Sequence, residues 1–559
     1  MNASSLTVTE TGHFVNTNTI PVNANDDASS TFLVGTVAVE PSATSVVTNR
    51  GEMALFDLHC GSGTTTSRGI FENFGIVRIG RKFTIGRHGY GRFHLHKGGQ
   101  LLKTYFHSKP VLIGHGAGAV GEVVFDDDVT LDNGDSIQLG NAQSARGSLT
   151  VNDARLQVNG NVLLANGLGS RAQLELTGDA VLRLDNNGSL NIGRATGAVA
   201  RVTLRGHAAL DHVSNLRIPG EEGATGVVEV LDHAVVTNLT QKKIVLAEPR
   251  NTHGELIVGD DAYVGPLTNL TVGLIRDVPT AQVTMRGGTI GIKGGGGGVW
   301  SLFLGNKNQT ELKARICGWG RILRTGSSSD MIRMAPYGQI VADGAGEARD
   351  LDFHQVRTVG LSSSENHNTT GSNGWYAVSK GRLVYPRIQE VNGNSHRVVG
   401  DYPNRADPKL VNSLRVTMDT YPSTANYHIY AELYAPDRTD VPTGLPVQSK
   451  DIVKGVWRLG FSSGNGLPQE PTPVSFSGLT LQIRHDALDI PEDYKMDVWH
   501  HDGSSSGGWR RVMQSRPFDA GNTLLQTTEK VEPSSETWNA GWFAVIARNT
   551  SGGVMVIVR

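Results

Sequence analysis

The feature that most constrains the fold of this chain is a repeat of about 26 residues between about residues 90 and 320. A fixed period in this range is typical of stacked supersecondary units, each of which contacts only its neighbours, and not of a globular domain with a deep cleft. The clearest copies begin at Gly121-Glu-Val-Val-Phe125, Gly147-Ser-Leu-Thr-Val151, Ala172-Gln-Leu-Glu-Leu176, Ala200-Arg-Val-Thr-Leu204, Gly226-Val-Val-Glu-Val230, Gly254-Glu-Leu-Ile-Val258 and Ala281-Gln-Val-Thr-Met285.

Each repeat contains three short strands, as in residues 149–151, 156–158 and 162–164. Most of them alternate apolar and polar residues, so their side chains point to opposite faces. Two or three apolar side chains cannot form a core alone, but coils stacked about 4.8 Å apart can. The sequence therefore predicts an all-β chain with a right-handed parallel β-helix. A sandwich or barrel would also alternate, but would not keep the same three strands in the same order over so many copies.

The third strand of the repeat ends in a glycine, which we expect to take a positive φ at the corner of the coil. Five copies show this pattern: Val111-Leu-Ile-Gly114, Ile137-Gln-Leu-Gly140, Leu190-Asn-Ile-Gly193, Leu270-Thr-Val-Gly273 and Leu302-Phe-Leu-Gly305.

Length and strand pattern divide the 559 residues into four predicted parts. Residues 1–65 are strand-like but out of register, and we expect an N-terminal β cap because an open β-helix end exposes unpaired backbone groups. The β-helix is predicted over 66–390 and a linker rich in Asn, Gly and Pro over 391–410. Longer strands separated by Gly, Pro and Asp predict an antiparallel β-sandwich over 411–559.

Composition limits the partners and the location. A formal net charge of −2 argues against nucleic acid and anionic membranes as partners. The sequence contains no run of about 18 apolar residues, so no membrane-spanning helix is predicted. The polar surface, rich in Thr, Asn, Gly and Ser, predicts an extracellular or cell-surface protein. Because residues 1–30 show no signal peptide, a mature secreted protein and a virion protein both stay open.

The chain has two cysteines, Cys60 and Cys317, at opposite ends of the repeat region. About nine coils separate them, which is roughly 40 Å at the strand spacing. A disulfide needs Cα atoms within about 7 Å, so two separate buried thiols are predicted. The absence of a disulfide framework favours a bacterial or phage protein over a eukaryotic secreted one.

Two sets of motifs resemble a known group of proteins. The recurring Gly-x-Leu-x-Val and Leu-x-Ile-Gly units, together with Met496-Asp-Val-Trp-His-His-Asp-Gly503 and Gly541-Trp-Phe-Ala-Val545, are similar to autotransporter-associated and PEP-CTERM-type bacterial surface proteins. The resemblance implies a β-helix closed by a small β-domain and supplies no catalytic residue. The chain departs from that group in that its sequence predicts neither an outer-membrane barrel nor a C-terminal sorting signal with an apolar helix, which argues against barrel or covalent anchoring.

Histidines and carboxylates between residues 88 and 135 are the metal-ligand candidates. His94 and His96 flank Leu95 and share one face, with His107 or His115 as a third ligand from another coil. The alternative is an outward polar ladder. Asp126, Asp128 and Asp132 belong to an acidic run whose oxygen density resembles a Ca²⁺-binding turn. The run lacks the regular spacing of known Ca²⁺ motifs, so a solvated acidic turn is the main interpretation and no cofactor is predicted, with Ca²⁺ as the alternative. A polar column at a solvated corner is not expected to be catalytic and comprises Asp153, Asp179, His207, His233 and Asp261.

Residues that break the repeat are the candidates for chemistry if the chain is an enzyme. Arg349, Asp350, Asp352 and His354 are the catalytic candidates for a polysaccharide lyase or glycoside hydrolase, by analogy with other β-helices. Enzymes of this fold usually form a cleft from long insertions, and the central coils carry short turns. Aromatic side chains that stack on sugar rings are predicted to be Trp300 and Trp319, and in the C-terminal part Trp499 and Trp509, unless the latter two belong to a sandwich core.

The sequence thus predicts a non-catalytic, secreted or surface-displayed structural or adhesive protein. Its expected partners are further copies of itself, as a homo-oligomer or filament, and polysaccharide. A polysaccharide lyase or glycoside hydrolase with a groove along the β-helix is the first alternative. A trimeric phage tailspike is the second.

Overall fold

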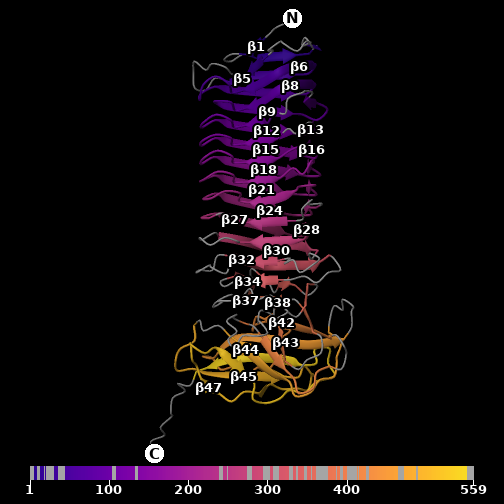
Figure 1. The fold of residues 1–559 in the computed structure, drawn as a ribbon, viewed down its shortest axis with the longest axis vertical. Helices are drawn as coiled ribbons and strands as arrows, with labels where there is room; N and C mark the ends of the chain where they lie inside the picture. The colour runs from indigo at the N-terminus through magenta and orange to yellow at the C-terminus, as the bar shows by residue number, and fades with distance from the viewer. Residues whose placement is uncertain are drawn as a thin grey trace, which may run out of the picture. The chain divides into compact units, whose positions relative to one another are not determined.

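A computed structural model describes the fold in two compact units, residues 1–291 and residues 292–559, each considered separately below (Figure 1). Every regular element in the described residues is a β-strand. The described part of the chain contains no helix long and apolar enough to cross a bilayer. The structure describes residues 5–8, 13–17, 19–20, 31–34, 44–103, 109–131, 136–237, 243–248, 250–273, 280–293, 302–305, 314–325, 332–334, 338–344, 349–353, 356–359, 375–385, 387–390, 395–398, 412, 414–422, 427–463, 471–485 and 489–549.

The first unit is a parallel β-helix in which every coil adds one strand to each of three parallel ladders (Figure 1). The first ladder carries the repeat that the sequence shows, with Gly121, Gly147 and Ala172 in register on successive coils. Its strands, in stacking order, are β2 (His13–Asn16), β5 (Thr44–Asn49), β7 (Arg68–Asn73), β9 (Tyr90–Leu95), β12 (Val120–Phe125), β15 (Arg146–Asn152), β18 (Arg171–Thr177), β21 (Val199–Leu204), β24 (Thr225–Val230), β27 (His253–Gly259) and β30 (Thr280–Ile292).

The other two ladders complete each coil, and two long strands turn a corner and belong to both. The second ladder consists of β3 (Thr19–Ile20), β6 (Glu52–Cys60), β8 (Ile76–Ile85), β10 (Gln100–Lys103), β13 (Val129–Leu131), β16 (Arg155–Val158), β19 (Val181–Leu184), β22 (Ala209–Asp211), β25 (Val235–Val236) and β28 (Tyr263–Leu267). The third consists of β1 (Ser5–Val8), β4 (Thr31–Val34), the ends of β6 and β8, β11 (Val111–Ile113), β14 (Ile137–Leu139), β17 (Val162–Leu164), β20 (Leu190–Ile192), β23 (Asn215–Ile218), β26 (Lys243–Leu246) and β29 (Asn269–Val272).

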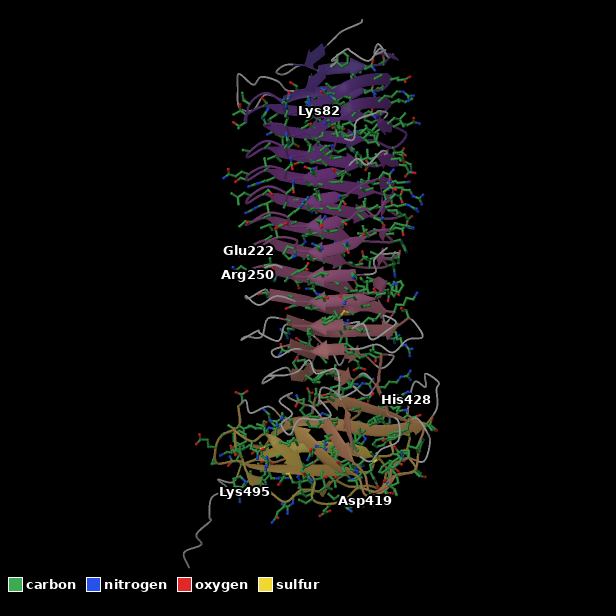
Figure 2. The ribbon with its side chains drawn as sticks, in the orientation of Figure 1. Lys82, Glu222, Arg250, Asp419, His428 and Lys495 are labelled. Atoms are coloured by element: carbon green, nitrogen blue, oxygen red, sulfur yellow. The ribbon has the colours of Figure 1, made fainter. Side chains whose placement is uncertain are left out.

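The core of this unit forms because parallel pairing in register places like side chains above one another. Phe71 and Phe93 stack with ring centroids 5.5 Å apart, and Phe125 follows on the next coil, 6.4 Å from Phe93. Polar side chains project from the coils instead, as Lys82 and Glu222 do (Figure 2). The alternation of apolar and polar residues thus separates the interior from the solvent-facing surface.

The corner glycines after the third strand have the backbone conformation that the sequence predicts. Gly114, Gly140 and Gly193 have φ values of 70°, 60° and 66°. A side chain is strongly disfavoured in this left-handed region. At Gly114, moreover, an added Cβ would lie 2.1 Å from the carbonyl oxygen of Arg146 on the next coil. Glycine therefore allows both the sharp corner and the close approach of the coils.

The coil register extends into the range 1–65 that the sequence assigned to a cap. Strand β5 pairs in parallel with β7, and β2 pairs in parallel with β5. The side chains of Asn16, Asn49 and Asn73 form a buried column across these strands. Their interior contains hydrogen-bonded amides at the position where the next coils have Leu95 and Phe125.

The second unit contains further parallel strands and two antiparallel sheets. Parallel pairs join β31 (Leu302–Leu304) to β33 (Ile332–Met334), β32 (Ala314–Arg324) to β34 (Gly338–Asp343) and β37 (Trp375–Lys380), β35 (Asp350–Asp352) to β32 and β38 (Arg382–Val384), and β36 (Arg357–Val359) to β39 (Arg387–Glu390). Strand β42 (Tyr427–Tyr434) runs antiparallel to both β38 and β39.

Strand β42 also begins the larger antiparallel sheet, which continues through β43 (Ile452–Ser463), β49 (Gly541–Arg548) and β45 (Lys495–His501), with β46 (Arg510–Arg511) and β47 (Arg516–Pro517) beside β45. The smaller sheet consists of β40 (Ser395–Val398), β41 (Leu414–Thr417), β44 (Thr480–Arg484) and β48 (Leu524–Gln526). The predicted fold class, a parallel β-helix followed by antiparallel β-structure, is confirmed. Strand β40 lies within the range 391–410 predicted as a linker, and the predicted domain limits stay predictions.

Candidate functional site

The candidate site lies on the outward side of the first ladder, where two histidines meet carboxylates from the neighbouring coils. Strand β7 pairs with β9 so that Glu72 lies beside His94. His96 directly follows β9, and Leu95 between the two histidines points into the core. The alternation of the strand therefore places both imidazoles on the same outer face, as the sequence predicts.

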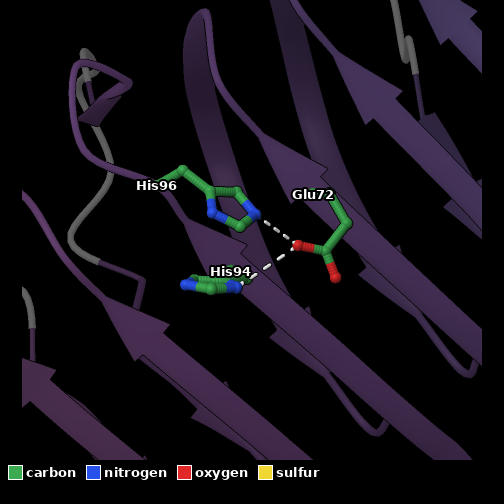
Figure 3. Close-up of side chains that lie close together, drawn as sticks. All are labelled: Glu72, His94 and His96. Carbon is green, nitrogen blue, oxygen red and sulfur yellow. Dashed lines mark hydrogen bonds and ion pairs between the residues drawn. The ribbon is translucent and has the colours of Figure 1, made fainter.

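The two imidazoles converge on one carboxylate oxygen (Figure 3). Nε2 of His96 lies 2.6 Å from Oε2 of Glu72, and Nδ1 of His94 lies 3.3 Å from the same atom. The two rings are tilted by 36° with centroids 3.7 Å apart. All three side chains are mostly covered yet reachable from solvent, with 15% of His94, 21% of Glu72 and 24% of His96 exposed.

A second carboxylate holds His94 from the opposite side. Nε2 of His94 lies 2.6 Å from Oδ2 of Asp126, which follows β12 on the next coil. Asn152 donates a hydrogen bond to the other oxygen of Asp126 at 2.8 Å, and Thr177 donates to Oδ1 of Asn152 at 2.6 Å. Burial alone would raise the pKa of Asp126, but the hydrogen bonds from Asn152 and His94 outweigh it and lower that pKa. Asp126 is therefore an ionised, oriented acceptor.

An aromatic side chain fixes the orientation of His96. The ring of Phe74 stacks on the imidazole with centroids 3.8 Å apart and planes only 4° apart. The guanidinium of Arg50 lies 4.6 Å from the centre of the Phe74 ring. Phe74 is 37% exposed, so this stack forms part of the surface.

The sequence did not indicate the acidic partners of the histidines: Glu72 was not a candidate, and Asp126 was assigned to the acidic run. A third ligand was expected from His107, which lies outside the described residues, or from His115. His115 instead follows β11 at a corner of the third ladder, where its Nδ1 lies 3.1 Å from Nδ2 of Asn141. The third side chain is Glu72, and the signal that identifies it is the pairing of Glu72 with His94, 22 residues later in the sequence.

The rest of the acidic run binds backbone N–H groups of adjacent coils. Oδ1 of Asp128 accepts a hydrogen bond from the amide of Arg155 at 2.6 Å, and Oδ2 of Asp127 accepts one from Gly98 at 2.6 Å. Asp132 lies outside the described residues. These contacts support the interpretation of the run as an acidic turn that caps neighbouring coils. The Ca²⁺ site stays a prediction.

The polar corner column predicted from the repeat is present. His207 and His233 stack with ring centroids 5.2 Å apart. Nδ1 of His207 lies 3.6 Å from a carboxylate oxygen of Asp179, and Nδ1 of His233 lies 3.6 Å from one of Asp261. All four side chains are more than half exposed, which is the solvated arrangement that the sequence indicated.

The catalytic candidates of the second unit lie on a regular strand. Asp350 and Asp352 belong to β35. The carboxylate of Asp350 accepts hydrogen bonds from Arg382 at 2.7 Å and Arg438 at 2.7 Å. The guanidinium of Arg349 lies 4.8 Å from the ring centre of half-buried Trp319. His354 and Trp300 lie outside the described residues.

Most aromatic side chains of the antiparallel part are core residues. Trp457, Trp538 and Trp542 are at most 5% exposed, and Tyr427, Tyr430 and Tyr434 are buried as well. Trp499 and Trp509 are partly buried against a core cluster that includes Trp542. Trp509 donates a hydrogen bond from Nε1 to the carbonyl oxygen of Pro442 at 3.2 Å. A glycan-stacking role for these two side chains stays a prediction.

Both cysteines are free and buried, as the sequence predicts. Burial raises the pKa of the Cys60 thiol, so this side chain is a core residue and not a reactive nucleophile.

Comparison with known proteins adds no relative: no family model, no curated protein and no solved structure matches the chain.

Proposed function

We propose that this chain is a structural or adhesive protein of the cell surface or extracellular space, whose β-helix displays ordered polar columns. The observation that carries the proposal is the direct bonding of outer side chains from coil to coil. Asp126, Asn152 and Thr177 form one such chain of contacts, and the stacked His207 and His233 form another. Side chains held in columns at the coil spacing provide a rigid, repetitive surface for contact with a partner.

The partners we propose are further copies of the chain and polysaccharide. Large repeated faces suit association between copies, since one contact can recur along the coils. For polysaccharide, the half-buried Trp319 offers an aromatic surface on which a sugar ring can stack. Arg349 beside it adds a positive charge that suits uronates. Bacterial surface display follows from the sequence resemblance and belongs to the same proposal.

The test combines light scattering with a binding and turnover screen on the purified full chain. We expect the molar mass to rise with protein concentration, or the chain to be retained on a uronate-containing or neutral polysaccharide. Retention should fall at least tenfold in Trp319→Ala. The matched control is Tyr421→Ala, which removes an aromatic side chain that is 41% exposed in the same unit.

The same samples are followed for unsaturated products by ultraviolet absorbance and for new reducing ends. Turnover that disappears in Asp352→Ala would overturn the structural proposal and establish a lyase or hydrolase. A chain that neither associates nor binds any polysaccharide on the panel would overturn it as well.

A further inference from the structure

We propose that Glu72, His94 and His96 bind one divalent transition-metal ion of the Zn²⁺ class on the outer face of the first ladder. The inference does not depend on the proposed function. One ligand atom from each of the three side chains lies within 4.8 Å of the other two. Glu72 lies on β7, His94 on β9 and His96 directly after β9, so the ion would link two adjacent coils.

The two distances from the histidines to the carboxylate match a tetrahedral site after a small adjustment. Zn–N and Zn–O bonds of about 2.0–2.1 Å place two ligand atoms roughly 3.3 Å apart. Nδ1 of His94 and Oε2 of Glu72 are already 3.3 Å apart. Nε2 of His96 is 2.6 Å from the same oxygen, so this pair must open by roughly 0.7 Å, which rotation of the Glu72 side chain can supply.

The hydrogen-bond partners of His94 are compatible with a cation between His94 and Glu72. Both ring nitrogens of His94 face a carboxylate oxygen, from Glu72 at Nδ1 and from Asp126 at Nε2. A neutral imidazole has only one N–H group and cannot donate to both. A metal ion bound at Nδ1 satisfies both contacts, because the Nε2–H group then donates to Asp126 and the Nδ1 lone pair binds the ion; an imidazolium that donates from both nitrogens is the alternative, which the titration below distinguishes.

The residues behind the ligands form the support that metal sites require. A ligating histidine usually donates its second N–H to a carboxylate, which fixes the tautomer and the ring orientation. Asp126 occupies this position and is itself held by Asn152. Phe74 stacks on His96 and limits its rotation. Both histidines are thus oriented by neighbours that are not ligands.

The donor set identifies the class of ion. Two imidazoles and one carboxylate favour Zn²⁺, Co²⁺, Ni²⁺ or Cu²⁺, whereas Ca²⁺ and Mg²⁺ prefer sites made only of oxygen. Three protein ligands leave a fourth position for water or for a group from a partner. Because 24% of His96 is exposed, an ion can enter from solvent without unfolding of the coil.

The test is calorimetric titration of the untagged full chain, stripped with a chelator, with ZnCl₂. We expect one equivalent to bind with a dissociation constant in the micromolar range or tighter. Glu72→Gln and His96→Ala should each weaken this binding at least tenfold, and Asp126→Asn roughly tenfold or more, the usual loss for a supporting residue. The visible absorption of added Co²⁺ should show tetrahedral coordination and disappear in the same variants.

The matched control is the double variant His207→Ala, His233→Ala. It removes two stacked histidines flanked by carboxylates, yet on an open corner, and should leave the titration unchanged. Glu72→Gln nearly preserves the shape of the side chain. A circular dichroism spectrum that matches the wild type would show that the variant loses metal binding without unfolding of the coil. Equal affinity in wild type, Glu72→Gln and His96→Ala would overturn the proposal, as would binding that depends on His88 and His115 instead.

Discussion

Asn49 donates a hydrogen bond from Nδ2 to Oδ1 of Asn73 on the next coil, 2.7 Å away, and both side chains are completely buried. Asn16 in turn donates to Oδ1 of Asn49 at 2.7 Å. The column ends at Leu95, which occupies the same register position one coil later. Amides that stack in register satisfy one another and the adjacent backbone, so the interior of the first coils tolerates polar side chains without water.

Asn49→Ala should lower the free energy of unfolding by about 2–3 kcal/mol. The substitution removes the acceptor of one Asn16 hydrogen bond and the donors to Oδ1 of Asn73 and to the carbonyl oxygen of Ile76, and a buried polar group that loses its partner costs about 1–3 kcal/mol. Urea unfolding followed by circular dichroism measures the loss. Asn166→Ala, which breaks the partly exposed bond from Asn166 to Asn141, should cost less than half as much. Equal losses in the two variants would show that burial does not strengthen the hydrogen bonds of the asparagine column.

Gly114→Ala should destabilise the β-helix more than Gly118→Ala. Both glycines have a φ of 70°, which costs a non-glycine residue about 1–2 kcal/mol. A Cβ at Gly118 meets open space, whereas at Gly114 it would overlap the carbonyl of Arg146. Overlap of this kind adds about 1–3 kcal/mol. Thermal unfolding of the two variants gives the difference directly, and identical midpoints would contradict the close packing of coils at this corner.

Stability should fall as the pH is lowered from about 6.5 to about 4. Burial lowers the pKa of His500 to about 4 and that of His59 to about 4. The unfolded chain takes up these protons near pH 6.5, before the native chain does, so each buried histidine lowers the free energy of unfolding by roughly 1.4 kcal/mol per pH unit in this window. Below about pH 4 their contribution should be constant.

The variant His500→Gln separates this effect from the titration of carboxylates. Its free energy of unfolding, measured in urea at several pH values, should change less steeply between pH 6.5 and 4.5, with His59 still contributing. His207→Gln, at a residue that is 70% exposed, should keep the wild-type slope. An unchanged slope in His500→Gln would contradict the lowered pKa of this side chain.

Arg382→Met should destabilise the second unit by about 3 kcal/mol. Arg382 donates to Asp350 at 2.7 Å and to Glu432 at 3.0 Å, and Glu432 is only 5% exposed. Removing one partner of a buried ion pair typically costs about 3–5 kcal/mol, and we expect the lower end because Glu432 keeps the hydroxyl of Tyr434 and Asp350 keeps Arg438.

The control for this prediction is Arg510→Met. Its partner Glu529 and Arg510 itself are both more than half exposed. An exposed pair contributes at most about 1 kcal/mol, so this variant should be almost neutral. Urea unfolding monitored by tryptophan fluorescence compares the two variants. An unchanged free energy of unfolding in Arg382→Met would show that the contacts of Arg382 with Asp350 and Glu432 do not stabilise the unit.

The fold was predictable because its determinants are local and repeated. Alternation recurs in the strands of each coil, and a glycine with a positive φ recurs at the corner after the third strand in several coils, as Gly114 and Gly140 show, with Ala165 and Ala247 in its place in two others. The site was only half predictable. The pair His94 and His96 is visible in one strand, but Glu72 enters from the preceding coil, in a region where buried asparagines interrupt the apolar pattern. Without that pattern the sequence alone cannot align the first coils.

Strand β42 has a consequence for how copies of the chain can meet. It runs antiparallel to both β38 and β39, so the backbone groups on that side of these two strands are already paired. An unpaired strand edge is a template on which another molecule can extend a sheet, and this one is closed. A second copy could not polymerise here by adding a coil in register without displacing β42. At this edge, therefore, a second copy could meet the chain only through side-chain surfaces and not by extending the parallel ladders.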